Sequence, residues 1–83
     1  HHIIEEETFN ILFNEIKNLP DSSKEVMLLA LNGLKNQEIA DELNVSINTV
    51  KTQKKIAYAK LKTRIHPIMN NVLLFLENRK TNK

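Results

Sequence analysis

The stretch from Asn36 to Lys55, which reads NQEIADELNVSINTVKTQKK, constrains the fold of this chain more than any other part of its sequence. Ile39 and Leu43 are four residues apart and therefore share one face of a helix, beside the small residue Ala40. A small residue at this place lets the backbone of a second helix approach closely. The stretch therefore predicts two short helices that cross at a steep angle, which is the helix-turn-helix arrangement.

The link between these two helices has its own signals. Asn44 is one of the few residues other than glycine that tolerate the left-handed conformation of a sharp turn. We expect Val45 to fill the turn from the inside. Ser46 is a good N-cap, with Thr49 three residues further on, because its hydroxyl can accept a hydrogen bond from a free backbone N–H of the next helix. The second helix is therefore predicted to begin near Ile47.

The second helix has an apolar face and a polar face. We expect its apolar residues to face the body of the domain, namely Val50, Ala57, Leu61 and Ile65. The N-terminal part of such a helix can enter the major groove of DNA, so polar residues here are candidates for base and phosphate contacts. The candidate DNA-binding residues are Ser46, Asn48, Thr49, Lys51, Thr52 and Lys55. Ser46 and Thr49 are assigned to helix capping and phosphate contact, and the more distant Lys60, Lys62 and Arg64 to a solvated face.

The chain before the helix-turn-helix predicts two further helices. From about Glu5 to Asn18, an apolar stripe repeats at helical spacing and consists of Phe9, Leu12, Phe13 and Ile16. Leu19-Pro20 ends this helix, and Asp21 or Ser22 is expected to cap the next one, where Ser22 and Glu25 have capping-box spacing. Its inner face is expected to hold Val26, Leu29 and Ala30. Gly33 suits its C-terminus.

A last helix is predicted after Pro67, since a proline is favourable in the first turn and the preceding His66 disfavours helix. Its apolar residues Ile68, Val72, Phe75 and Leu76 are expected to pack against the stripe of the first helix. A single glycine, two prolines and no alternating stretch predict an all-α fold, a small bundle of four to five helices without winged strands.

The composition of the chain excludes several kinds of site. The chain has no cysteine and therefore no disulfide or thiolate metal site, and it has no apolar run near the ~20 residues that span a bilayer. We expect a cytoplasmic protein without a cofactor, a bound metal or catalytic residues. Residues 1–2 are interpreted as a tag remnant, residues 3–80 as a single domain and residues 81–83 as a frayed tail.

Charge is distributed unevenly along the chain. Residues 1–42 carry a formal charge of −6 and residues 43–83 carry +8, within a net charge of +2. The basic part contains the second helix of the predicted helix-turn-helix. This asymmetry would orient an encounter with the phosphates of DNA.

The residues EVMLLALNGLKNQEIADELNVSINTVKTQKKIAYAKLK, preceded by Leu19-Pro20, resemble region 4 of bacterial extracytoplasmic-function sigma factors. The resemblance covers about Leu19–Leu61. In that family a capping serine is common where this chain has Lys35, so Asn36 is expected to cap instead. Lys54 occupies a position that is often apolar in the family.

The resemblance implies that the domain reads the minus-35 element of double-stranded promoter DNA and docks on the beta flap of the RNA polymerase core, with an anti-sigma factor as a further partner. The output domains of LuxR-type regulators carry a very similar run of residues. The amphipathic helix before Leu19-Pro20 favours the sigma-factor arrangement. A LuxR-type output domain and a module that binds only proteins remain as alternatives.

Overall fold

The computed structural model describes residues 6–64, which form four helices. They are α1 (Glu6–Lys17), α2 (Asp21–Leu31), α3 (Asn36–Leu43) and α4 (Ile47–Leu61). No strand occurs within residues 6–64, and the prediction of a small all-α domain is confirmed. The expected last helix after Pro67 lies outside the described residues, as do Ile65, the interpreted tag remnant and the frayed tail.

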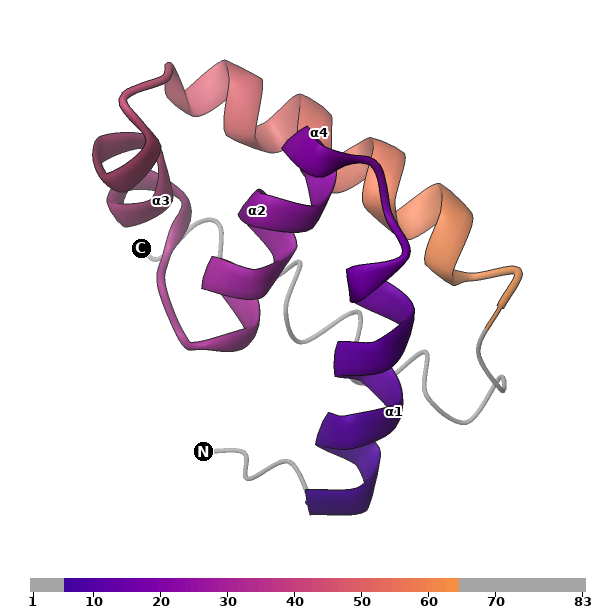
Figure 1. The fold of residues 1–83 in the computed structure, drawn as a ribbon. Helices are drawn as coiled ribbons and strands as arrows, with labels where there is room; N and C mark the ends of the chain where they lie inside the picture. The colour runs from indigo at the N-terminus through magenta and orange to yellow at the C-terminus, as the bar shows by residue number, and fades with distance from the viewer. Residues whose placement is uncertain (1–5, 65–83) are drawn as a thin grey trace.

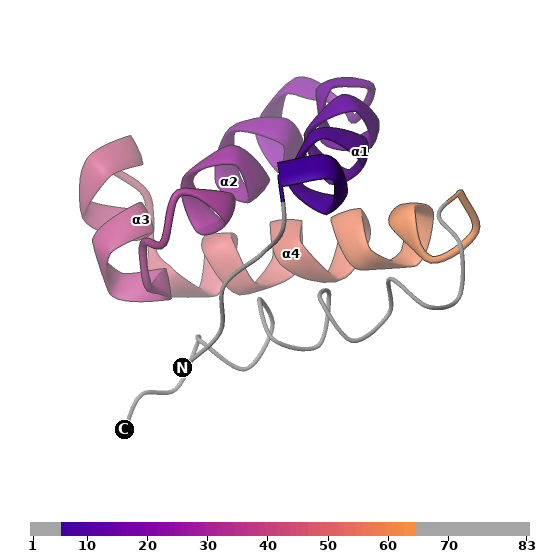
Figure 2. The ribbon, with the colours of Figure 1, turned by 90° about the horizontal axis from the view of Figure 1, so that it is seen from below.

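Helix α2 lies at the centre of the arrangement, between α1 and α3 (Figure 1). Helix α4 runs beneath α2, with its N-terminal half beside α3 and its C-terminal half toward α1 (Figure 2). Because α4 crosses the whole bundle in this way, it contributes to two separate apolar clusters, one at each of its ends.

The first cluster joins α1, α2 and the C-terminal half of α4. Its buried members are Leu12, Ile16, Leu19, Met27, Leu31, Ala57, Tyr58 and Leu61. Phe9 and Phe13 pack against it while partly exposed, with stacked rings whose centroids are 6.2 Å apart. The predicted stripe of the first helix is therefore confirmed as its inner face.

The second cluster joins α2, α3 and the N-terminal half of α4. Its buried members are Val26, Ala30, Ile39, Ala40 and Val50. Ala40 is almost fully buried at the point where α3 meets α4, as expected for a small residue at a close helix crossing. Adjacent positions of α2 serve different clusters, since Val26 and Ala30 belong to this cluster whereas Met27 and Leu31 belong to the first.

The start of α2 differs from the prediction. The N-cap position is Pro20, with φ −57° and ψ 154°, and no side chain accepts a capping hydrogen bond there. The Pro20 carbonyl accepts hydrogen bonds from Lys24 N at 2.8 Å and from Ser23 Oγ at 3.2 Å. The prediction that Asp21 or Ser22 caps this helix is wrong, because the extended Pro20 already places Asp21 inside the first turn.

The link from α2 to α3 combines a predicted glycine turn and an unpredicted cap. Gly33 has φ 100°, and Leu34 N donates to Leu29 O at 3.1 Å, which closes the end of α2 as predicted. At the start of α3, Lys35 N donates to Glu38 Oε1 at 2.7 Å. The expectation that Asn36 caps α3 is wrong, because Asn36 is the first helical residue and is fully buried.

Candidate nucleic-acid interface

The turn between α3 and α4 is built around Asn44. This residue has φ 58° and ψ 48°, the left-handed conformation that the sequence predicts. Val45 N donates to Ala40 O at 3.0 Å, which reverses the chain. The prediction that Val45 fills the turn from the inside is wrong, since its side chain is 39% exposed. Leu43 and Ile47, on either side of the turn, pack against the second cluster instead.

Ser46 caps α4 as predicted. Its Oγ accepts a hydrogen bond from Thr49 N at 3.0 Å and lies 2.9 Å from Thr49 Oγ1. The cap ties the first turn of α4 to the end of the turn segment. Ser46 and Thr49 are both exposed, so their hydroxyl groups lie at the surface at the positive end of the helix dipole.

The polar candidates share one property, which is exposure along the stretch from the N-cap of α4 to just past its middle. All of them are exposed in the structure, namely Ser46, Asn48, Thr49, Lys51, Thr52 and Lys55. Val50 and Ala57 on the opposite side of α4 are completely buried. The helix is therefore anchored by its apolar face while the candidate residues remain accessible.

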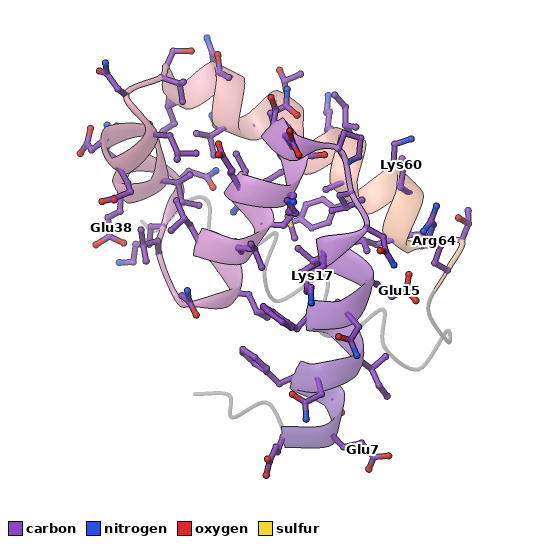
Figure 3. The ribbon with its side chains drawn as sticks, in the orientation of Figure 1. Glu7, Glu15, Lys17, Glu38, Lys60 and Arg64 are labelled. Carbon is purple, nitrogen blue, oxygen red and sulfur yellow. The ribbon has the colours of Figure 1, made fainter. Side chains whose placement is uncertain are left out.

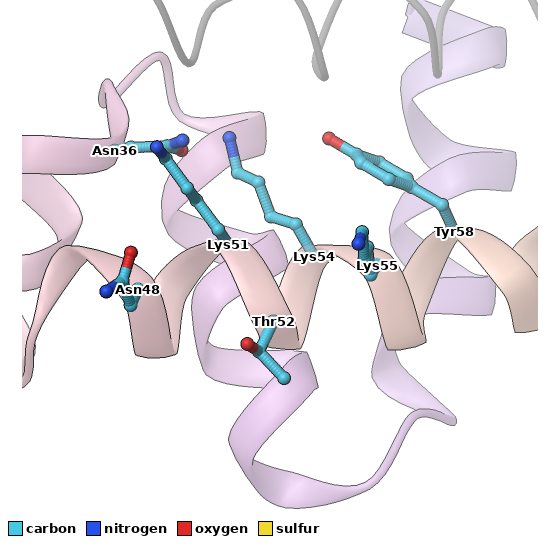
Figure 4. A pocket seen from close by; sticks show the side chains of 7 residues that line it. All are labelled: Asn36, Asn48, Lys51, Thr52, Lys54, Lys55 and Tyr58. Atoms are coloured by element: carbon cyan, nitrogen blue, oxygen red, sulfur yellow. The ribbon is translucent and has the colours of Figure 1, made fainter.

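Beside α4 lies a hollow of about 300 Å³, seen from close by in Figure 4. It is lined by Asn36 of α3 and by six residues of α4, namely Asn48, Lys51, Thr52, Lys54, Lys55 and Tyr58. Four of the candidate residues thus border one concave surface, whereas Ser46 and Thr49 do not. The concave surface joins the start of α3 to the exposed side of α4.

Three of the lining residues were absent from the sequence-based set of candidates. Lys54 is only 3% exposed, and Tyr58 and Asn36 are also buried. The signal for Lys54 and Tyr58 was present in the spacing, since they follow Val50 by four and eight residues on the same helical face. Asn36 had no such signal, because it belongs to α3 and no local spacing connects it to α4.

The two helices of the motif carry charges of opposite sign, acidic on α3 and basic on α4. Residues 43–64 contain five lysines and Arg64 but no acidic residue. Helix α3 carries the exposed acids Glu38, Asp41 and Glu42, and Gln37 Nε2 donates to Asp41 Oδ1 at 3.0 Å. The cationic side of the motif is therefore α4, and a polyanion would be attracted to that helix rather than to the outer face of α3.

Other kinds of site have no support in the part of the chain that the structure describes. Within residues 6–64 no group of three or more histidine or acidic side chains is arranged to hold a metal ion. The helices described here are too short or too polar to cross a membrane.

Comparison with known proteins gives one match. The family model of the bacterial regulatory proteins of the luxR family, GerE, matches residues 17–66. No curated protein and no solved structure matches the chain. The matched range contains α2, α3 and α4, and therefore the whole helix-turn-helix with the hollow beside it.

Proposed function

We propose that this chain, which belongs to the luxR family of bacterial regulatory proteins, reads double-stranded promoter DNA with the N-terminal half of α4. The family match identifies a helix-turn-helix domain that binds DNA and regulates transcription, and the family is regulatory rather than enzymatic. What remains to be proposed is the set of contacting residues and the kind of regulator to which the domain belongs.

One observation carries the assignment of the contacts. The completely buried side chains of Val50, Ala57 and Leu61 anchor α4 in the two apolar clusters, while the polar residues of its first turns are exposed. A helix held in this way can enter a major groove without losing its packing. Asn48, Lys51, Thr52 and Lys55 are assigned to base edges, and Ser46 and Thr49 to the adjoining phosphates.

For the kind of regulator, we propose the promoter-reading domain of a sigma factor. The support comes from α1, which lies almost entirely before the matched range 17–66. Leu12 and Ile16 of this helix are completely buried against α2 and α4. A helix that precedes Leu19-Pro20 and is integral to the core agrees with the arrangement expected for sigma region 4, whose protein partners are the RNA polymerase beta flap and an anti-sigma factor.

The second candidate is the output domain of a LuxR-type regulator. It is favoured by the family match itself, which covers α2, α3 and α4 without needing α1. The two candidates differ in their protein partner, since only the sigma factor is expected to bind the polymerase flap directly.

Two measurements test these proposals separately. Selection of bound duplexes from a random-sequence library by the 83-residue chain should enrich one sequence motif. Failure to enrich any motif at low salt would contradict DNA reading. Titration of the isolated polymerase beta flap with the chain should then give saturable binding, and flap binding that is absent while a DNA motif is enriched would favour the LuxR-type candidate.

A further inference from the structure

Two of the three large apolar side chains that are exposed within residues 6–64 lie in charged surroundings of opposite sign. They are Val45, which follows the acidic helix α3, and Ile56, which lies on the basic helix α4. A single exposed apolar side chain is common on a protein surface. An apolar centre with a charged rim is also the composition of a protein contact, and here the two rims have opposite charges.

The first surface is the outer side of α3, which we call the acidic face. Asp41 and Glu42 follow Glu38 by three and four residues and therefore share one side of the helix, and all three are exposed. Val45 lies three residues beyond Glu42, in the turn that ends α3. None of these acids forms an ion pair within residues 6–64. The acidic face therefore offers three carboxylates to a cationic partner.

The second surface runs along α4 and the turn after it, and we call it the basic row. Ile56, Lys60 and Arg64 are spaced by four residues and are all exposed. Lys60 follows Lys55 by five residues, which is about 140° around a helix of 3.6 residues per turn. The row therefore faces away from the proposed DNA-reading surface. Arg64 remains half exposed although it is paired with Glu15 at 3.9 Å.

The two surfaces lie at opposite ends of the molecule. Glu38 is at the α3 end, whereas Lys60 and Arg64 are at the other end, where α4 meets α1 (Figure 3). The surfaces therefore cannot meet within one chain, but the basic row of one copy can meet the acidic face of the next. Such a contact joins two different surfaces, so it repeats head to tail and does not close around a two-fold axis.

We propose that copies of this chain bound at adjacent DNA sites contact one another head to tail, with the basic row of one copy on the acidic face of its neighbour. Lys60 and Arg64 pair with the carboxylates of α3, and Ile56 packs against Val45. Exposed ion pairs are individually weak and are screened by salt. This inference rests on the proposed DNA-reading function, because the duplex supplies the effective concentration that such a small contact needs.

The measured quantity is the affinity for two adjacent copies of the selected motif relative to the affinity for one copy. On direct repeats, tested over a series of spacings, the wild-type chain should show cooperativity of about ten-fold at the best spacing, which corresponds to about 1.4 kcal/mol. On inverted repeats it should show none, because a head-to-tail contact requires both copies to point the same way. Cooperativity confined to inverted repeats would reveal a two-fold contact and overturn the inference.

Charge reversal tests the two surfaces. A first variant combines Asp41→Lys with Glu42→Lys, and a second combines Lys60→Glu with Arg64→Glu. Each variant alone should bind direct repeats without cooperativity, because like charges then meet. An equal mixture of the two should recover cooperativity, since each variant presents to the other a surface of opposite charge. If the second variant does not fold, Lys60→Glu alone takes its place.

Glu6→Lys combined with Glu7→Lys is the matched control for the first variant. It reverses two exposed acids on α1 and changes the net charge by the same amount. Its cooperativity should equal that of the wild-type chain. Equal losses in the control and in the first variant would indicate an effect of net charge and contradict the inference.

Two further outcomes separate this inference from DNA reading itself. If the wild-type chain binds a single motif but shows no cooperativity on any direct repeat, the head-to-tail contact is wrong and DNA reading stands. If the wild-type chain binds no single motif, both proposals fail. A mixture that stays non-cooperative, although each variant binds a single motif, would likewise exclude the contact between the acidic face and the basic row.

Discussion

Arg64 and Glu15 connect the end of α4 to α1, with Arg64 Nη1 3.9 Å from Glu15 Oε1 (Figure 3). The two residues are 49 positions apart in the chain and face each other because both helices pack on the first cluster. Arg64 was expected on a solvated face, and its side chain is indeed half exposed. The pair nevertheless lies where α1 meets the C-terminal end of α4.

This ion pair should contribute little to stability. Half exposure of Arg64 leaves the attraction screened by water, so the coupling energy from a double-mutant cycle of Glu15→Gln and Arg64→Gln should be at most about 1 kcal/mol. The measurement is urea unfolding at low and at high salt. A coupling of several kcal/mol would show that the pair is far better shielded than its exposure indicates.

The hydroxyl of Ser46 should stabilise the domain. Ser46→Ala removes the acceptor of the Thr49 N–H and should lower the free energy of unfolding by about 1 kcal/mol. Ser22→Ala is the matched control, because Ser22 is exposed at the start of α2, where no side-chain cap is formed. Equal losses in the two variants, measured by urea unfolding, would contradict the capping assignment.

The burial of Leu12 makes α1 part of the core. Leu12→Ala should lower the free energy of unfolding by about 2–5 kcal/mol, since it removes a completely buried side chain and leaves a cavity. The neighbouring Ile11 is 45% exposed, and Ile11→Ala should cost much less. Circular dichroism during thermal unfolding gives both values. A neutral Leu12→Ala would mean that α1 is dispensable, and the main argument for the sigma-factor arrangement would be lost.

The lysines at the start of α4 should supply electrostatic affinity for DNA. Lys51→Ala combined with Lys55→Ala should weaken binding to the selected duplex and reduce the slope of log affinity against log salt by about two, one for each positive charge removed from the surface that faces the DNA. Fluorescence anisotropy over a range of salt concentrations measures both quantities.

Lys17→Ala provides the control for charge alone. Lys17 lies in the last turn of α1, with its ammonium 5.4 Å from the centre of the Phe13 ring, on a different helix from the proposed contacts. Its removal should leave the salt slope unchanged. A slope that falls equally in this variant would indicate attraction by net charge and not by the α4 surface.

Local sequence signals predicted the elements and most of their ends. The apolar stripe of α1, the glycine turn at Gly33, the left-handed Asn44 and the Ser46 cap all depend on neighbours within about five positions, and helix periodicity and capping chemistry act over that range. The errors at Ser22 and Asn36 are of another kind. Both have suitable capping chemistry, but the backbone at Pro20 and Lys35 already occupies the capping positions.

The chain by itself therefore determined its helices, its helix-turn-helix and the accessible polar residues of α4, because these follow from short-range spacing. Only the tertiary structure decided that Val45 is exposed and that Asn36, at the start of α3, is completely buried. The reason is physical. Burial depends on which distant helix covers a residue, and the path of α4 past α3, α2 and α1 brings together positions that no local pattern connects.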